Sequence, residues 1–265
     1  MIVCRSQAEI EKLRRVNQLV AGVLAELRTL AVPGATTADI DRVAEERVRA
    51  AGAVPAFKGY HGFPSTICTS INEEVVHGIP SSRPLEAGDV FSIDMGARLD
   101  GFFGDSAVTV PVGEVAEADA ALLRITEEAL FLGLEAVRPG ARVSDIGAAV
   151  QAHVEAHGFA VVREFVGHGI GTELHEEPQV PNYGPGGRGP RLTEGMVIAV
   201  EPMVTAGKPG VRVLSDGWTA VTKDGGRAAH FEHTIAVTRD GCEILTLLAQ
   251  DRDRARQLQG AAVRS

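Results

Sequence analysis

The chain of 265 residues is poor in the features that mark secreted and membrane proteins. It contains only three cysteines, at positions 4, 68 and 242, and no two of them form a CxxC pair. Such spacing provides no disulfide framework and fits a reducing compartment. The chain also lacks a run of about 18 apolar residues, and its charged N-terminus lacks the apolar core of a signal peptide. These absences predict a cytoplasmic protein without a membrane span.

Positive charge and linker sequence are scarce as well. Lysine and arginine total 26 against 35 acidic residues, a net charge of −9, and no basic cluster interleaves with aromatic residues. Nucleic acid is therefore not an expected partner. No polar or low-complexity stretch divides the chain, so we expect a single domain over residues 1–250. The mixed-charge residues 251–265 are expected to form a flexible tail.

What the chain does contain is an internal repeat. Residues 85–94, LEAGDVFSID, return at 192–201 as LTEGMVIAVE, and both copies end an apolar run with a carboxylate, Asp94 or Glu201. A carboxylate at the end of a buried strand is costly unless a metal ion or a paired charge satisfies it. The recurrence of this costly choice indicates a duplicated scaffold that brings acidic groups to one shared site.

Further landmarks keep nearly the same offset. The Pro-Gly pair at 33–34 returns at 139–140 after 106 residues, and the His-Gly pair at 61–62 returns at 168–169 after 107. Asp105 and Glu232 correspond at an offset of 127, so about 20 residues, Trp218 among them, are inserted in the second copy. The two similar halves cover about residues 6–112 and 117–248.

Each half is predicted to contain two helices followed by strands. Ser6 and Glu9 form the pattern of a capping box, and Gly52 and Gly158 end the two helix pairs. The expected helices cover residues 6–30, 38–51, 117–137 and 145–157. The expected strands are apolar and β-branched and cover residues 64–71, 88–97, 103–112, 160–168, 195–206 and 230–238. Helices grouped before strands favour an α+β fold with antiparallel sheet over a doubly wound fold.

Asp94 and Asp105 are predicted to share one face of a β-hairpin. Asp100-Gly101, which lies between them, is typical of a two-residue turn. That turn pairs Gly96 with Asp105 and makes Asp94 its diagonal neighbour, about 7–8 Å away between α-carbons. Two carboxylates on one face repel unless a divalent cation lies between them. The apolar residues around the pair argue against the alternative, a solvated hairpin face.

Glu201 and Glu232 are the counterparts of this pair in the second half. Two-fold packing of the halves would bring four carboxylates together, for which a metal cluster is one of few stable arrangements. His168, within the glycine-rich residues 166–171, adds an imidazole. This mixed set suits two divalent ions about 3.5–4 Å apart. A phosphate loop is the other interpretation of the glycines, but the helix that such a loop precedes is missing.

Two further histidines, His77 and His175, lie in turn-rich segments. If the five residues above hold metal, these two are free to hydrogen-bond a substrate carbonyl or the oxyanion formed from it. For each histidine alone, an ordinary surface position in a loop is an equally good interpretation. Cys68 lies in an apolar strand with no adjacent base, which favours a packing role over a nucleophilic one.

The order of these residues and the motifs around them closely resemble the type I methionine aminopeptidases of the M24 metallopeptidase family. The motifs are Tyr60-His-Gly-Phe-Pro64, Ile71-Asn-Glu-Glu-Val-Val-His-Gly-Ile-Pro80, His175-Glu-Glu-Pro178 and Phe231-Glu-His-Thr234. The resemblance extends over about residues 6–248. It implies the pseudo-two-fold "pita-bread" fold, an α+β domain with two helix pairs outside a curved, largely antiparallel sheet.

The resemblance also implies a ligand arrangement. Asp105 and Glu232 would bridge two divalent ions, Asp94 would bind one ion, and His168 with Glu201 would complete the other. Manganese, iron, cobalt and zinc all suit such donors. A monovalent cation is a further candidate. The expected partners are a peptide or nascent-polypeptide N-terminus and the ribosome, and the expected form is a monomer.

The implied reaction is hydrolysis of the initiator methionine from polypeptides whose second residue is small. Glu201 would accept a proton from the water that the metals activate. His175 would stabilise the oxyanion, and His77 would contact the scissile amide. His77 and His175 would thus bind substrate at the scissile bond. The residues that would line the methionine pocket are Tyr60, Phe63, Cys68, Leu174 and Trp218, with Phe57 at its edge.

Three pocket positions depart from several relatives, which carry cysteine, tyrosine and phenylalanine where this chain has Phe57, Phe63 and Leu174. Two other functions remain open. A proline-specific aminopeptidase or dipeptidase would use the same five ligands, although such relatives usually carry a large N-terminal domain. A binding protein that kept the fold without catalysis is the second alternative, although the presence of all five ligands argues against it.

Overall fold

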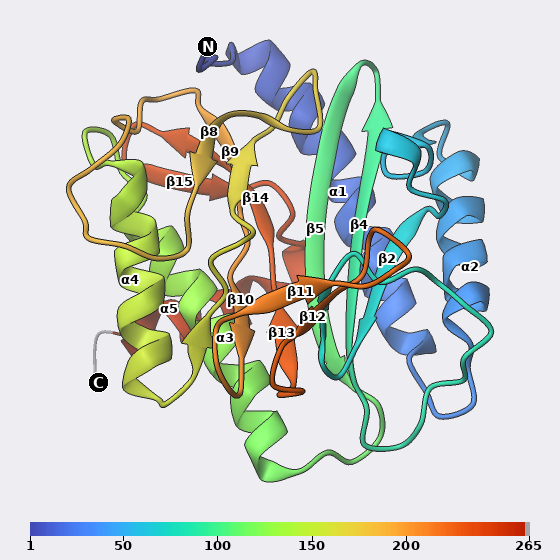
Figure 1. Ribbon diagram of the computed structural model, residues 1–265. Coiled ribbons are helices and arrows are strands. Elements are labelled where there is room, and N and C mark those ends of the chain that lie inside the picture. Colours follow the sequence, from blue (N-terminus) through green and yellow to red (C-terminus); the bar gives the residue numbers. More distant parts are fainter. Residues whose placement is uncertain (263–265) are drawn as a thin grey trace.

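Two helix pairs enclose the sheets of the computed structural model, which describes residues 1–262, with side chains through Leu258. The pairs are α1 (Gln7–Leu30) with α2 (Thr37–Ala50), and α3 (Glu117–Glu135) with α4 (Val143–Ala156). Helices α2 and α4 lie at opposite outer sides of the molecule (Figure 1). The helix positions and the α+β class agree with the sequence-based expectations.

The capping box that opens α1 is present. The Ser6 hydroxyl accepts a hydrogen bond from the Glu9 backbone N–H, while the Glu9 carboxylate accepts one from the Ser6 backbone N–H at 2.8 Å. Helix α2 ends just before Gly52, whose φ of +74° lies in the left-handed region that glycine adopts at no steric cost. Local sequence therefore sets both ends of the first helix pair.

The first half of the chain forms a four-stranded antiparallel sheet. Its central strand is β4 (Val90–Leu99), which forms a hairpin with β5 (Phe102–Pro111) and also pairs with β2 (Ile67–Ile71) and β1 (Val54–Pro55). The hairpin register is the predicted one, because Gly96 pairs with Asp105. Positive φ values at Asp100 (51°) and Gly101 (85°) match the turn type that suits the twist of two paired strands.

The second half repeats this plan with broken strands. One sheet has the order β15 (Gly241–Ile244), β14 (His233–Thr238), β9 (Val197–Val200), β7 (Gly167–Gly169) and β8 (Glu176–Val180). The other has the order β13 (Ala228–His230), β10 (Met203–Thr205) and β6 (Ala160–Val161). All pairs are antiparallel.

Continuous strands over 160–168, 195–206 and 230–238 were therefore the wrong expectation. The first is divided into β6 and β7. The second breaks at Glu201-Pro202, where proline has no N–H for the ladder. The third breaks before Glu232, whose backbone N–H instead donates to the carbonyl of Ala107 in the other half, at 2.9 Å. Two of the breaks thus fall at acidic residues predicted to be ligands.

The two halves join along β5 and the segment β13–β14, which lie next to each other in Figure 1. Side chains of β5 and β14 make the connection. Ser106 donates to the carbonyl of Glu232 at 2.8 Å, and Thr234 donates to the carbonyl of Asp105 at 2.8 Å. These bonds place the backbones of Asp105 and Glu232 side by side across the pseudo-two-fold axis.

The residues inserted in the second half form a bridge to the first. Strand β12 (Ala220–Thr222) pairs with β11 (Val211–Val213) on one side and with β3 (Glu74–Val76) on the other, in a small antiparallel sheet. The loop between β11 and β12 carries Trp218. The insertion therefore places Trp218, a residue of the second half, next to residues of the first half.

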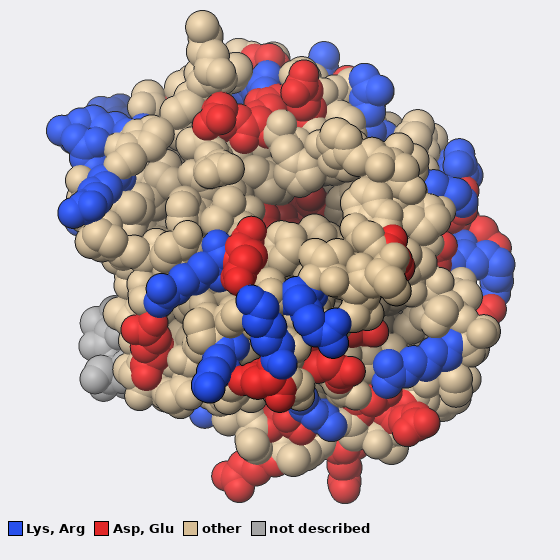
Figure 2. Space-filling model, in the orientation of Figure 1, with Lys and Arg blue, Asp and Glu red and all other residues tan. Residues whose placement is uncertain are grey.

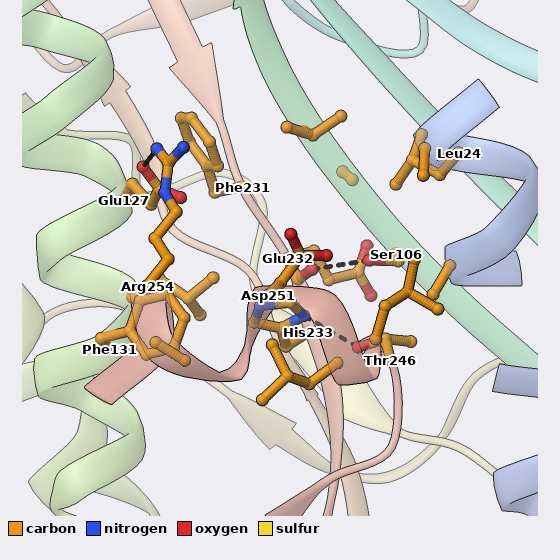
Figure 3. Close-up of a pocket in the computed structure, with 18 of the residues that line it drawn as sticks. Leu24, Ser106, Glu127, Phe131, Phe231, Glu232, His233, Thr246, Asp251 and Arg254 are labelled. Carbon is orange, nitrogen blue, oxygen red and sulfur yellow. Dashed lines mark hydrogen bonds and ion pairs between the residues drawn. The ribbon is translucent and has the colours of Figure 1, made fainter. Parts of the chain in front are cut away.

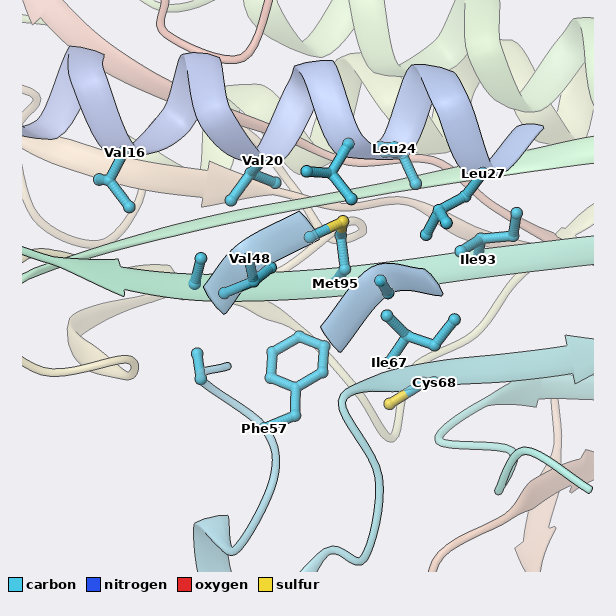
Figure 4. Close-up of a cluster of buried hydrophobic side chains, with 14 of the residues drawn as sticks. Val16, Val20, Leu24, Leu27, Val48, Phe57, Ile67, Cys68, Ile93 and Met95 are labelled. Atoms are coloured by element: carbon cyan, nitrogen blue, oxygen red, sulfur yellow. The ribbon is translucent and has the colours of Figure 1, made fainter. Parts of the chain in front are cut away.

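The core of the first half lies between α1 and the hairpin. Figure 4 shows Val20, Leu24 and Leu27 on the inner face of α1, close to Ile93 and Met95 of β4. Cys68 of β2 belongs to the same cluster and is only 5% exposed. Full burial of each large aliphatic side chain contributes about 1.5–3 kcal/mol, so this layer holds the hairpin rigidly behind the site.

Within the segment expected to be a flexible tail, the chain forms a helix, α5 (Arg252–Ala262), which follows a short turn, η2 (Ala249–Asp251). Ala255 is buried, and Arg254 pairs with Glu127 of α3. These contacts attach the segment to α3, and its residues line a cavity of about 90 Å³ behind the Ser106–Glu232 connection (Figure 3). Residues 263–265 lie outside the described part of the chain. No helix among residues 1–262 is both long and apolar enough to cross a membrane.

Candidate metal centre and active site

Four carboxylates and one imidazole converge where the halves meet. Asp94 and Asp105 come from β4 and β5, Glu201 follows β9, and Glu232 precedes β14, while His168 lies on β7. The Nε2 atom of His168 is 3.4 Å from Oε1 of Glu201 and 4.0 Å from Oδ2 of Asp105. Ligand atoms of Asp105, His168 and Glu232 all lie within 4.8 Å of one another. The structure thus brings together all five residues that the sequence singled out.

Several oxygens in this cluster have no hydrogen-bond donor. One carboxylate oxygen each of Asp94, Asp105 and Glu232 is buried without a partner among the described residues. An unsatisfied buried carboxylate oxygen is strongly unfavourable, whereas a divalent cation satisfies several at once. The donor set therefore fits bound metal.

The ionisation of the four carboxyls leads to the same conclusion. Burial raises the pKa of Asp94 to about 7. Burial, with the neighbouring charges of Glu232 and Asp94, also raises the pKa of Asp105 well above its usual range, and the pKa values of Glu201 and Glu232 rise for the same reasons. Burial and mutual repulsion therefore favour the protonated forms of these carboxyls, and a bound cation would favour release of the protons.

His168 is held in the form that binds metal. Its Nδ1 is 2.9 Å from the carbonyl oxygen of Gly169, so Nδ1 carries the proton and donates it to that carbonyl. The Nε2 lone pair then faces the carboxylates. Burial lowers the pKa of His168 to about 3, which keeps the ring neutral.

A cavity of about 310 Å³ opens above the cluster. Figure 2 shows its mouth as a recess in this face of the molecule, with acidic side chains at the base. All the residues predicted for the pocket line it: Phe57, Tyr60, Phe63, Cys68, His77, Leu174, His175 and Trp218. The acidic base and the largely apolar wall therefore belong to one site.

Aromatic side chains shape this wall. Phe63 and Trp218 meet edge to face with ring centroids 5.2 Å apart. The Asp216 carboxylate fixes the backbone of Trp218 by accepting its N–H at 2.8 Å. Phe57 packs against Gly96, where an added Cβ would lie 2.8 Å from the Phe57 ring. Glycine at position 96 is therefore required for phenylalanine at position 57.

The cysteine in the wall is a packing residue in the structure. Cys68 pairs with Asp94 across β2 and β4. Burial and the negative charge of Asp94 raise the pKa of its thiol. A neutral thiol is a poor nucleophile, which agrees with the interpretation from the sequence.

The two additional histidines face the cavity as neutral rings. His77 has a φ of +61° and packs edge-on against Phe165 at 5.2 Å, and burial lowers its pKa to about 4. His175 lies 4.3 Å from His168 between ring centroids, and its Nδ1 is 2.8 Å from the hydroxyl of Tyr60. Burial lowers the pKa of His175 as well.

Residues 11–239 match Metallopeptidase family M24. The chain belongs to this family. It is 52% identical over 246 residues to methionine aminopeptidase 1 of Bacillus subtilis, an alignment that covers 93% of this chain and 99% of that relative.

Solved structures of other proteins have the same fold. A methionine aminopeptidase from Thermotoga maritima superposes with a TM-score of 0.92 at 47% identity, covering 94% of this chain and all of that one. The prolidase from Pyrococcus furiosus has a TM-score of 0.75 at 22% identity, covering 93% of this chain and 66% of that one. The latter likeness extends to the fold alone.

The cavity is also lined by residues that the sequence analysis did not predict. They are His61, Val76, Phe165, Val166, Met203 and His230. His230 is 2% exposed, and its Nε2 has no hydrogen-bond partner in the described part of the chain. That atom is 3.8 Å from Oε2 of Glu201. The alternation of side chains in extended backbone could have revealed it, because His230 is two residues before Glu232.

Proposed function

We propose that this protein removes the N-terminal methionine from peptides and nascent polypeptides whose second residue is small. The observation that carries the proposal is the convergence of five metal-binding side chains at the base of a largely apolar cavity. Membership of the M24 family and near full-length likeness to methionine aminopeptidases support it. A recessed cavity with carboxylates at its base suits a peptide N-terminus as substrate.

We further propose that the site holds two divalent ions. Asp105 and Glu232, whose backbones are joined across the two halves, would serve both ions. Asp94 would bind one ion, and His168 with Glu201 would bind the other. Mixed oxygen and nitrogen donors suit manganese, iron, cobalt or zinc. When bound, such ions polarise the scissile carbonyl and lower the pKa of an attacking water.

Glu201 is the proposed proton acceptor. Its carboxylate lies at the base of the cavity with one oxygen toward His168 and the other toward His230. It is buried among other carboxylates, so its pKa in the absence of metal is raised. A buried carboxylate with raised basicity can take a proton from water and pass it to the leaving amine.

His175 is the proposed donor to the oxyanion. If the Tyr60 hydroxyl donates to Nδ1, the ring proton lies on Nε2, the nitrogen left free for the substrate. Such a preset donor stabilises the negative charge that develops on the carbonyl oxygen. His77, which directly follows β3, would contact the scissile amide.

The methionine side chain would occupy the part of the cavity whose wall is formed by Tyr60, Phe63, Cys68, Leu174 and Trp218. Methionine is flexible, and its sulfur makes favourable contacts with aromatic ring edges. Phe57 narrows one side of the cavity and would favour an unbranched side chain. The aromatic pair Phe63–Trp218 offers both a ring face and a ring edge.

A peptide assay with defined metal content tests the function. Metal-free protein is reconstituted separately with each of the four ions and given Met-Ala-Ser or Ala-Pro-Ser. We expect cleavage of Met-Ala-Ser alone and a metal content of about two ions per chain. Cleavage of Ala-Pro-Ser alone would indicate a proline-specific peptidase. Binding of the peptide without cleavage under any metal would indicate a non-catalytic protein.

A further inference from the structure

The segment before α1 reaches the loop that carries Leu174 and His175. The guanidinium of Arg5 donates hydrogen bonds to both carboxylate oxygens of Glu176, one of them at 2.5 Å. The two side chains are only 6% and 13% exposed. This ion pair joins positions 171 residues apart, immediately beside the proposed oxyanion donor.

Glu176 also forms hydrogen bonds within its own loop, residues 171–176. Its Oε1 accepts the backbone N–H of Thr172 at 2.8 Å and that of Glu173 at 3.1 Å. The carboxylate therefore fixes the turn over 171–176 and attaches it to Arg5. Both contacts with the carboxylate come from one guanidinium nitrogen, Nη2, and hydrogen bonds between charged groups are roughly twice as strong as neutral ones.

The backbone around Arg5 is shaped to admit it. A Cβ on Gly171 would overlap the Arg5 guanidinium, so only glycine leaves space for that group. The Arg5 N–H donates to the carbonyl of Gly195 at 2.7 Å, and a Cβ on Gly195 would lie 2.8 Å from the Arg5 carbonyl oxygen. Arg5 is thus held by its main chain and by its side chain.

We infer that Arg5 is a positioning residue which, through Glu176, holds Leu174 and His175 against the cavity. Leu174 is 1% exposed in the wall, and His175 is held from the other side by Tyr60. A buried ion pair is strongly disrupted by loss of one partner, because the remaining charge is left uncompensated. The inference deepens the proposed function, on which it rests for the role of His175.

The loop supplies no member of the carboxylate–imidazole cluster, so loop position and metal binding can be separated by experiment. The variants are Arg5→Met, Arg5→Lys and the matched control Arg14→Met. Arg14 makes a bidentate ion pair from α1 to Glu243, away from the loop, and is more exposed. The readouts are kcat and KM for Met-Ala-Ser, metal affinity by calorimetry, and hydrogen exchange over 170–178.

Arg5→Met is expected to lower kcat about tenfold or more, to speed exchange in the loop about tenfold, and to leave the metal dissociation constant within about twofold. Arg5→Lys should recover part of the loss, and Arg14→Met should match the parent in all three readouts. Glu176→Gln is the second variant if Arg5→Met does not fold, and it should also speed loop exchange.

Wild-type kcat together with wild-type loop exchange in Arg5→Met would overturn the inference. So would faster exchange spread evenly over the whole chain, since that would show a general loss of stability. Failure of the wild-type protein to cleave Met-Ala-Ser would refute the proposed function instead, and the exchange data would still test the role of Arg5.

Discussion

Asn17 in helix α1 is hydrogen-bonded to the backbone of Asp105 in strand β5. Its amide oxygen accepts the Asp105 N–H at 3.3 Å, while its amide nitrogen donates to the carbonyl of Leu13 at 2.9 Å. Asn17 is completely buried. Glycine at 104 makes the approach feasible, since a Cβ there would lie 2.9 Å from the amide oxygen. A helix thus fixes the strand position of a proposed bridging ligand.

The substitution Asn17→Leu should affect both stability and metal binding. It leaves the Asp105 N–H buried and unsatisfied, which costs about 1–3 kcal/mol in the free energy of unfolding. We expect metal affinity to fall about tenfold, as for other residues that orient ligands. Urea unfolding and calorimetry measure the two effects. Gln18→Leu is the control, because its amide donates to carbonyls of Leu245 and Leu247 away from the cluster. Unchanged metal affinity in Asn17→Leu would contradict the role.

The substitution Glu201→Gln should separate folding from turnover. The amide keeps the size of the side chain but cannot accept a proton in the same way, so kcat should fall by about 10²–10⁴. Metal-free Glu201→Gln should be no less stable than the parent, because one buried carboxyl is removed. Circular dichroism with peptide assays at fixed metal content provides the check. Turnover equal to the parent would show that Glu201 is neither proton acceptor nor essential ligand.

Stability of the metal-free protein should fall as pH rises above about 6.5. The pKa of Asp94 is about 7 when folded and 3.8 ordinarily, and the pKa values of Asp105, Glu201 and Glu232 are raised too. Above pH 6.5 the folded state therefore binds more protons than the unfolded state, and unfolding becomes easier with rising pH. Below that pH, buried histidines such as His168, with a pKa of about 3, act in the opposite direction.

Metal should remove this pH dependence, because it replaces the protons of the cluster. Thermal unfolding at pH 6.5 and at about pH 8.5, with chelator or with saturating metal, tests the effect. The metal-free transition temperature should be lower at the higher pH, and the metal-induced increase should be larger there. Equal metal-free stability at both pH values would mean that the carboxyls are already ionised.

The substitution Tyr60→Phe should reduce kcat more than it changes metal binding. It removes the hydroxyl that holds Nδ1 of His175, so the ring loses its preferred orientation and tautomer. Loss of one hydrogen bond of about 1 kcal/mol corresponds to a decrease of about fivefold. Steady-state kinetics and metal titration provide the comparison. A change in metal affinity equal to the change in kcat would place Tyr60 in metal binding rather than in His175 orientation.

Local sequence predicted the elements whose signals lie within a few residues. The capping box at Ser6, the turn at Asp100-Gly101 and the register of Gly96 with Asp105 all agree with the structure. The strand break before Glu232 was missed because the Glu232 backbone N–H donates to Ala107 in the other half of the chain. The break at Glu201-Pro202 was missed although proline, which has no N–H, is a local signal for it. Helix α5 was missed because its order depends on packing against α3.

The sequence by itself determined the duplication, the helix ends and the identity of the five acidic and imidazole groups, since each is encoded in short patterns or in their repetition. Tertiary structure decided which side chains share the cavity. Trp218 reaches it through the pairing of β12 with β3, His230 through the joint with β5, and Arg5 braces it through Glu176. These contacts join distant segments, and they depend on how the two halves pack rather than on any local pattern.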